Sequence, residues 1–500
     1  MGNCCPICEP GQIAGFNTEI QCRVSLRVFT PGFHNRFQVT NHWHHYGWSG
    51  QLNAPAERFS SMSSGTSEHV SAPRLGSPYA WLVWSLAAIA FGYAFFHRVT
   101  PSVMVSDLMT EFAIGGAMLG TLSALYFYPY FLLQVPLGGM LEVFGTRRLL
   151  SVALLLAGIG SFLFGTAHSL EVAYLGRILI GIGSSVGFLG SLALASKWFP
   201  ANRFAFLAGL AMFIAMASGM AAQAPLAFFI DLYGWRSSLL ALGIFGFVLA
   251  ALVFLFVRNA PEESAVLPDA AADAASPSAS ARWSDLFASL RLAMVSADVW
   301  KMAIVAATMA GPMLALGGLW GTPYLMVAYD LTRTEAALYM SLLLLGWAIS
   351  SPTSGWLSDR IGQRKLILVW GSGLMSVMMT IIIFVPQLPF AVTVICLVMM
   401  GLSGGVMPAS FALVRDVMPT RLVGATTGIV NSMTVASGAI LQPLVGLALD
   451  LSWDGTIMDG ARHYAAADYR MAFLLVVASL VIGLLTAFSL RETPLEDGTP

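Results

Sequence analysis

The stretch GWLSDRIGQRK, residues 355–365, is a polar interruption between two long apolar runs, and it has a counterpart earlier in the chain. The earlier stretch, GGMLEVFGTRR at residues 138–148, places glycine, acid, glycine and two bases at the same relative positions, 217 residues upstream. A second set of matches recurs at a spacing of 219 residues. It pairs Pro200, Gly209, Ala217, Ser218, Gly219, Gln223 and Asp231 with Pro419, Gly428, Ala436, Ser437, Gly438, Gln442 and Asp450. Matches in two places at nearly one spacing predict two parallel repeats.

The composition indicates which solvent the repeats face. Hydrophobic residues make up 57% of the 500 residues and charged residues only 10%, whereas a soluble domain carries about 25% charged residues. So few charges cannot cover a water-exposed surface, so we expect much of the chain to face a lipid bilayer. The net charge of -1 gives no reason to expect nucleic acid as a partner.

Long apolar runs predict an all-α integral membrane protein with twelve transmembrane helices in two six-helix repeats. The predicted spans are 79–104, 115–140, 149–167, 172–195, 203–230, 237–257, 300–328, 335–357, 366–385, 389–414, 422–449 and 470–489. The runs are too long and too uniformly apolar for the alternating strands of a membrane barrel.

The spans divide the chain into five parts. We expect a disordered or non-native extension at 1–76, an N-terminal bundle at 77–257, a cytoplasmic linker at 258–298, a C-terminal bundle at 299–490 and a cytoplasmic tail at 491–500. With the first span starting in the cytoplasm, thirteen Lys and Arg residues fall in inner loops and the tail and four in outer loops. This asymmetry predicts cytoplasmic termini. We expect a monomer in the plasma membrane.

The loop at residues 355–365 resembles the loop signature of the major facilitator superfamily through Gly355, Asp359, Arg360, Gly362, Arg364 and Lys365. The copy at residues 138–148 departs from it, with Glu142 and Val143 in place of Asp and Arg. Arg177, Gly181 and Gly183 resemble the second motif of that superfamily. The resemblance covers about residues 78–490. It implies a transporter whose two halves rock about a central site.

The same resemblance implies that the two loops form a cytoplasmic latch that closes and opens during transport. Static anchoring by positive charge on the inner side is the alternative. The candidate latch residues are Glu142, Arg147, Arg148, Asp359, Arg360, Arg364 and Lys365.

His97 and Arg98 stand near the end of the first apolar run, where ionisable groups are costly and often functional. Their surroundings resemble the first helix of anion:cation symporters, in which an Asp-Arg pair stands at this place. We expect Arg98 to bind an anionic group of the substrate. His97 replaces the acid and can titrate near neutral pH, so we expect it to couple transport to protons. Snorkelling of Arg98 to the headgroups is the alternative.

Three further residues are candidates because of their depth in the spans. Arg177 resembles a residue with a role in proton transfer or gating, with interfacial anchoring as the alternative. Trp320 and Tyr324 are four residues apart on one helical face, where they could line a substrate path or only pack. Gln134, Gln223, Asn431 and Gln442 are expected to bond between helices, with contact to the solute as the alternative.

These observations predict a secondary active transporter of a small organic anion or zwitterion, driven by protons. A drug or metabolite exporter of the same fold is one alternative, and a non-transporting membrane sensor or scaffold is another. The sequence has no GxxxxGK[ST], HExxH or GxSxG motif, so we expect no ATP hydrolysis, no enzymatic activity, and no metal or cofactor.

Overall fold

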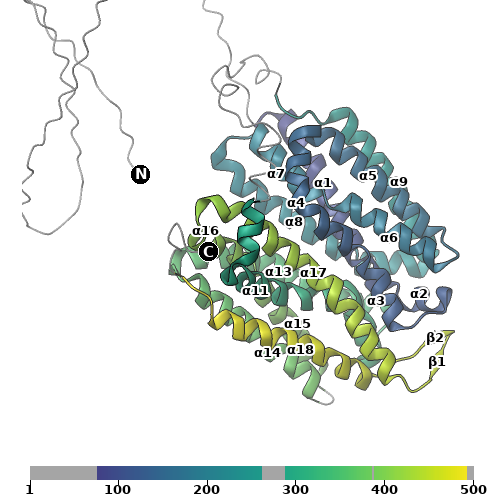
Figure 1. Ribbon diagram of the computed structural model, residues 1–500. Helices are drawn as coiled ribbons and strands as arrows, with labels where there is room; N and C mark the ends of the chain where they lie inside the picture. Colours follow the sequence, from purple (N-terminus) through teal and green to yellow (C-terminus); the bar gives the residue numbers. More distant parts are fainter. Residues whose placement is uncertain (1–75, 262–287, 386–387, 493–500) are drawn as a thin grey trace, which may run out of the picture. The chain divides into compact units, whose positions relative to one another are not determined.

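A computed structural model describes the chain over residues 76–261, 288–385 and 388–492. Within these ranges the chain is helical apart from short connections and one small β-hairpin (Figure 1). Helices satisfy backbone N–H and C=O groups within one segment, which the interior of a bilayer requires. The predicted all-α membrane fold is confirmed. The extension before residue 76, most of the linker and the end of the tail lie outside the described residues.

The helices of the first half run from purple to teal in Figure 1, and those of the second half from green to yellow. The elements of the first half are α1 (Pro78–Val99), the 3₁₀ turn η1 (Thr100–Val103), α2 (Val105–Phe112), α3 (Gly116–Ala124), α4 (Phe127–Phe144), α5 (Thr146–Gly165), α6 (Leu170–Ser184), α7 (Gly187–Trp198), η2 (Ala201–Arg203), α8 (Phe204–Ala221) and α9 (Ala224–Phe256). Those of the second half are α11 (Ala297–Ala315), the π-helix η4 (Leu316–Trp320), α12 (Gly321–Tyr329), α13 (Arg333–Ile361), α14 (Arg364–Phe384), α15 (Phe390–Gly404), α16 (Ala409–Val417), α17 (Thr420–Ser452), β1 (Ile457–Met458), β2 (Ala461–Arg462) and α18 (Ala466–Phe488).

Eleven helical stretches in the described residues are long and apolar enough to cross a membrane. One of them, Phe206–Phe256, is 51 residues long. A straight helix of that length would measure about 75 Å, against about 30 Å of hydrocarbon. Gly234 interrupts it with φ 79° and ψ 159°, angles that glycine adopts because it has no Cβ.

The segments before and after Gly234 run in opposite directions. α1 and α8 start at the same end of the molecule and finish together, where the hydroxyl of Ser102 donates to Gln223 Oε1 at 3.4 Å. After Gly234 the chain returns to the start of α5, where Arg147 Nε donates to the carbonyl of Phe254 at 2.7 Å. The stretch therefore crosses the membrane twice, and the described residues make the predicted twelve crossings.

Several crossings are interrupted part of the way through. α3 gives way to α4 at residues 125–126, α6 to α7 at 185–186, and α11 to α12 through the π-helix η4. Each break leaves carbonyl groups without their usual helical donors. In an apolar setting side chains must replace those donors, and this requirement positions several of the candidate site residues.

We call the end of the molecule that carries β1 and β2 the hairpin end, and the opposite end, where α9 stops and α11 begins, the linker end. Across the boundary between the halves, α3 and α4 run antiparallel to α17. Gly116 lies against Gly446 at the hairpin end, and further along Asn431 Nδ2 donates to Gln134 Oε1 at 3.2 Å. A Cβ at Gly138, one turn beyond Gln134, would meet no atom within 4 Å. The helices therefore separate toward the linker end.

The repeat-related boundary, between α8 and α13, follows the same pattern. A Cβ at Gly219 would lie 3.5 Å from Leu344 of the other half. Closer to the linker end, Gly209 of α8 and Gly355 of α13 lie at opposite positions of the two antiparallel helices. A Cβ at either glycine would meet no atom within 4 Å. Both boundaries are thus closed at the hairpin end and open at the linker end.

Candidate functional site

Arg98, in the last turn of α1, is 8% exposed. Its guanidinium carbon lies 4.4 Å from the centre of the Phe95 ring and 5.0 Å from that of Tyr130, with the rings of Tyr126 and Phe127 within 6 Å. In the described residues no carboxylate is paired with Arg98, and its Nε has no hydrogen-bond partner. Its contacts are the aromatic rings and the neutral hydroxyl groups of Tyr126 and Tyr130. A buried cation with no opposite charge beside it is costly, so this group is available to a negatively charged ligand.

The aromatic rings around Arg98 reach the boundary between the halves. The ring of Phe127 lies 3.2 Å from the place a Cβ would take at Gly438, and that of Phe95 lies 3.4 Å from the corresponding place at Gly219. Gly219 and Gly438 correspond to each other in the repeat. Arg98 is therefore placed where the halves meet, rather than inside one bundle.

Arg177, in α6, is completely buried and bonds to backbone carbonyl groups. Its Nη1 donates to the carbonyl of His97 at 3.0 Å, and its Nη2 to that of Ser123 at 3.0 Å. The His97 carbonyl lacks its usual helical donor because the residue four positions later is Pro101, which has no N–H. Ser123 precedes the break between α3 and α4. Arg177 thus joins three interrupted helices, and its predicted part in gating or proton transfer stays a prediction.

His97 faces the interior of the first bundle, away from the aromatic rings that surround Arg98. Its Nε2 is 3.1 Å from the hydroxyl of Ser161 on α5, and its ring packs edge-on to Tyr93 at 4.5 Å. Its Nδ1 has no hydrogen-bond partner. The structure therefore links His97 to Arg177 through a backbone carbonyl but does not bring it to the side chain of Arg98.

Trp320 and Tyr324 are both buried. The indole N–H of Trp320 donates to the carbonyl of Gln442 at 2.9 Å, and the ring of Tyr324 packs against Tyr469 and Phe473 of α18. Both residues hold the broken crossing α11–η4–α12 against its neighbours. Their predicted contact with substrate stays a prediction.

The glutamines Gln223 and Gln442 bond between helices, as the sequence indicates. In the π-helix the N–H of Gly321 bonds to Leu316, so the carbonyl of Gly317 is free for Gln223 Nε2 at 2.8 Å. Gln442 Nε2 donates to Leu314 at 2.8 Å in the same crossing. Gln223 thereby connects the first half to the second beside Arg98.

The first of the two signature loops is attached to its own half. Arg147 donates to the Phe254 carbonyl and its ring contact is with Phe254, while the side chains of Glu142 and Arg148 are exposed. The N–H of Arg147 is capped by Asn259 at 2.9 Å.

The second loop is likewise bound within the second half. Arg364 Nε donates to Asp416 at 2.9 Å and its Nη1 to the hydroxyl of Ser358 at 2.8 Å. The N–H of Lys365 donates to Glu492, and Arg360 lies over the ring of Trp356. The side chain of Asp359 is outside the described residues. The sequence interpretation missed Asp416 and Glu492, which no repeat or motif marks, and a latch between the halves stays a prediction.

Two six-helix halves that meet beside a buried cation, with no carboxylate paired to it among the described residues, are typical of a membrane transporter of the two-bundle class. The family model described as Major Facilitator Superfamily matches residues 86–322 and 302–500, and the chain belongs to this family. It is accordingly a transporter rather than an enzyme, and an integral membrane protein that crosses the bilayer many times.

The chain is similar over most of its length to transporters of named substrates. A probable sulfoacetate transporter of Cupriavidus necator is 22% identical, over 81% of this chain and 92% of that protein. The chloroplastic sodium-dependent phosphate transport protein 1 of Arabidopsis thaliana is 24% identical over 75% of each chain. Among solved structures, a bacterial homolog of the human lysosomal transporter Spinster, inward-facing and occupied, has a TM-score of 0.65. It is 17% identical and covers 82% of this chain and 97% of its own.

Proposed function

We propose that the chain is a secondary active transporter that moves a small organic anion across the plasma membrane by alternating access, coupled to protons. Arg98 binds the anionic group of the substrate. The linker end faces the cytoplasm, as the excess of Lys and Arg in its loops indicates, and both termini lie on that side.

The observation that carries this proposal is the state of Arg98. Its guanidinium is buried among four aromatic rings, and among the described residues no carboxylate is paired with it. Leaving a cation in an apolar setting without a partner costs free energy. A carboxylate, sulfonate or phosphate that binds there recovers that cost through bidentate, charge-assisted hydrogen bonds.

The relatives favour the same cargo. The probable sulfoacetate transporter and the phosphate transport protein carry anions by name. The second name includes sodium, so the coupling ion of this chain is tested directly below rather than taken from its relatives.

Alternating access is favoured by the register across the boundary. Gly138 and Gly428 face each other in the register of α4 and α17, and Gly209 and Gly355 in that of α8 and α13. All four lie in open space. In the opposite state these positions close, because helices without side chains at the contact can approach closely.

The test is uptake into proteoliposomes that contain the full-length protein. The panel comprises a small sulfonate, sugar acids, inorganic phosphate, a neutral sugar and a cationic drug, each with a proton gradient, a sodium gradient or neither. We expect uptake of at least one anion that increases with a proton gradient. Arg98→Gln should lower the uptake rate about 100-fold, because the charge pair with the substrate is lost. Arg421→Gln, at an exposed arginine of the linker end, is the matched control.

Different results would favour the other readings. Efflux of the cationic drug, unaffected by Arg98→Gln, would favour an exporter. Saturable binding without flux under any gradient would favour a sensor or scaffold. Anion uptake at the normal rate by Arg98→Gln would remove Arg98 from the binding site.

A further inference from the structure

Two carboxylates that the internal repeat relates, Asp231 and Asp450, have no role in the transport site. Each lies near the hairpin end of the fifth crossing of its half, Asp231 in α9 and Asp450 in α17. Each contacts the first residues of a helix that belongs to the other half. Asp450 contacts the helix that begins at Gly116, and Asp231 contacts the helix that begins at Arg333. Gly116 and Arg333 are 217 residues apart, which is also the spacing of the two repeated loops.

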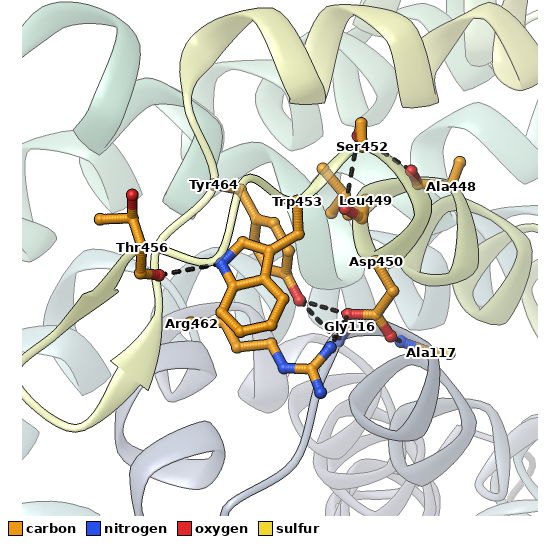
Figure 2. Close-up of polar contacts among 10 residues, drawn as sticks. All are labelled: Gly116, Ala117, Ala448, Leu449, Asp450, Ser452, Trp453, Thr456, Arg462 and Tyr464. Atoms are coloured by element: carbon orange, nitrogen blue, oxygen red, sulfur yellow. Dashed lines mark hydrogen bonds and ion pairs between the residues drawn. The ribbon is translucent and has the colours of Figure 1, made fainter.

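Asp450 caps the N-terminus of α3, as Figure 2 shows. The N–H of Gly116 donates to its Oδ1 at 2.8 Å and the N–H of Ala117 to its Oδ2 at 2.9 Å. α3 follows Gly115, which has no side chain that could cap these groups. The partial positive charge of the helix N-terminus attracts the carboxylate. An aspartate of the second half therefore supplies a cap that the first half lacks.

Two side chains of the second half hold the carboxylate of Asp450 in this position. The hydroxyl of Tyr464 donates to its Oδ1 at 2.6 Å, and Arg462 Nη1 lies 3.0 Å from the same oxygen. Figure 2 shows the indole of Trp453 against Arg462, with the guanidinium 4.4 Å from the ring centre. β2 and the residues around it thus aim Asp450 at α3.

Asp231 makes the equivalent contact with side chains instead of backbone. The hydroxyl of Thr334 donates to its Oδ2 at 3.1 Å, and Arg333 Nε lies 3.6 Å from its Oδ1. Arg333 is also paired, more closely, with Asp107 of the first half, with Nη1 2.9 Å from Oδ2. The N-terminus of α13 already has a capping box, formed by Thr332 and Glu335, so its N–H groups need no outside carboxylate. This local difference explains why the two repeat-related contacts use different donors.

We infer that these contacts are two pseudosymmetric latches, Asp450 with Gly116 and Ala117, and Asp231 with Arg333 and Thr334, which hold the halves closed at the hairpin end. The inference rests on alternating access but adds the groups that control one side of it. Both latches join the helices that must part when that end opens. Each consists of a few partly exposed polar bonds, so each is weak enough to break in every cycle.

The test measures distances in the purified full-length protein by double electron–electron resonance, without any transport assay. Spin labels are placed at Ser169→Cys and Ala391→Cys, two exposed positions of opposite halves at the hairpin end. Cys4, Cys5, Cys8 and Cys22 are replaced by serine. Asp231→Asn and Asp450→Asn are compared with Asp454→Asn, whose exposed carboxylate bonds locally to Thr456.

We expect each of the first two variants to raise the ratio of long to short distances about three- to tenfold, as the loss of one or two bonds to a charged group implies. The control should keep the distribution of the unmodified protein. An unchanged distribution in either variant would overturn the pair of latches, whether or not the protein transports an anion. Should a variant fail to fold, Thr334→Val tests the Asp231 latch and Tyr464→Phe the Asp450 latch by the same criterion.

Discussion

Arg98 and Arg177 are both buried in the first half, but their donors are used differently. Arg177 donates its N–H groups to backbone carbonyls beside helix breaks. Arg98 contacts aromatic rings and the hydroxyls of Tyr126 and Tyr130, and its Nε has no partner among the described residues. Arg177 is thus a structural group in the described conformation, and Arg98 is a group for binding.

Replacing Arg177 by glutamine should destabilise the protein. The carbonyl of His97 would lose its donor in an apolar setting, at about 1–3 kcal/mol for an unsatisfied group. We expect a lower thermal unfolding midpoint in detergent, followed by tryptophan fluorescence, and a smaller decrease for Arg177→Lys, which retains some donors. Arg421→Gln serves as the control. An unchanged midpoint would show that Arg177 is not the structural connection described here.

Replacing His97 by glutamine tests its predicted coupling role. Glutamine can bond to the hydroxyl of Ser161 as the histidine does but cannot take up a proton. We expect substrate uptake to continue with a flat dependence on pH between 5.5 and 8, because the variant has no group at this position that exchanges a proton. A pH profile identical to that of the unmodified protein would assign proton coupling to another group.

At the level of elements, close approach between α3 and α17 depends on two glycines. A Cβ at Gly116 would lie 2.7 Å from the carbonyl oxygen of Gly446, and a Cβ at Gly446 would overlap the backbone of Gly116. The contact brings the backbones together at the end where the Asp450 latch forms. Glycine is therefore required at both positions by the closed hairpin end.

Gly446→Ala should force α3 and α17 apart. We expect a loss of about 1–3 kcal/mol in the free energy of unfolding, as for overpacked sites, and more of the long distance between the labels at Ser169 and Ala391. Gly424→Ala is the matched control, because a Cβ there meets open space and alanine is the better helix former. Equal stability of the two variants would contradict the close contact.

For the molecule as a whole, the two halves share one pattern of contact, closed at the hairpin end and open at the linker end. The repeat places glycines at equivalent positions of both boundaries. Gly138 corresponds to Gly355 in the repeat, and Gly209 corresponds to Gly428. Rocking of the halves would exchange the closed and the open end.

Paired cysteines at the linker end report that motion. Gly138→Cys with Gly428→Cys, and separately Gly209→Cys with Gly355→Cys, should form little disulfide in the conformation described here. The yield should rise when Asp231→Asn or Asp450→Asn weakens the hairpin end. Oxidation followed by gel electrophoresis measures it, with each single cysteine as control. A yield that does not respond to either aspartate variant would argue against coupled motion of the two ends.

The fold could be read from the sequence because its signals are local or repeated. A bilayer sets the length of each apolar run, and the recurrence of residues 138–148 at 355–365 indicates two equivalent halves. The family motifs also pointed to Arg98, and Gln223 and Gln442 were recognised as groups that bond between helices. Such signals need no knowledge of which helices touch.

The partners of each side chain required the folded chain. Nothing in the sequence tells that adjacent residues His97 and Arg98 face different surroundings, since helix rotation and neighbouring helices decide this. Nor does it reveal that Asp450 bonds to Gly116, 334 residues away, although the repeat marks the aspartate itself. Capping and pairing over such separations depend on the packing of the two halves. Long-range packing alone leaves the Arg98 guanidinium without a carboxylate partner among the described residues, while each guanidinium nitrogen of Arg177 donates to a backbone carbonyl.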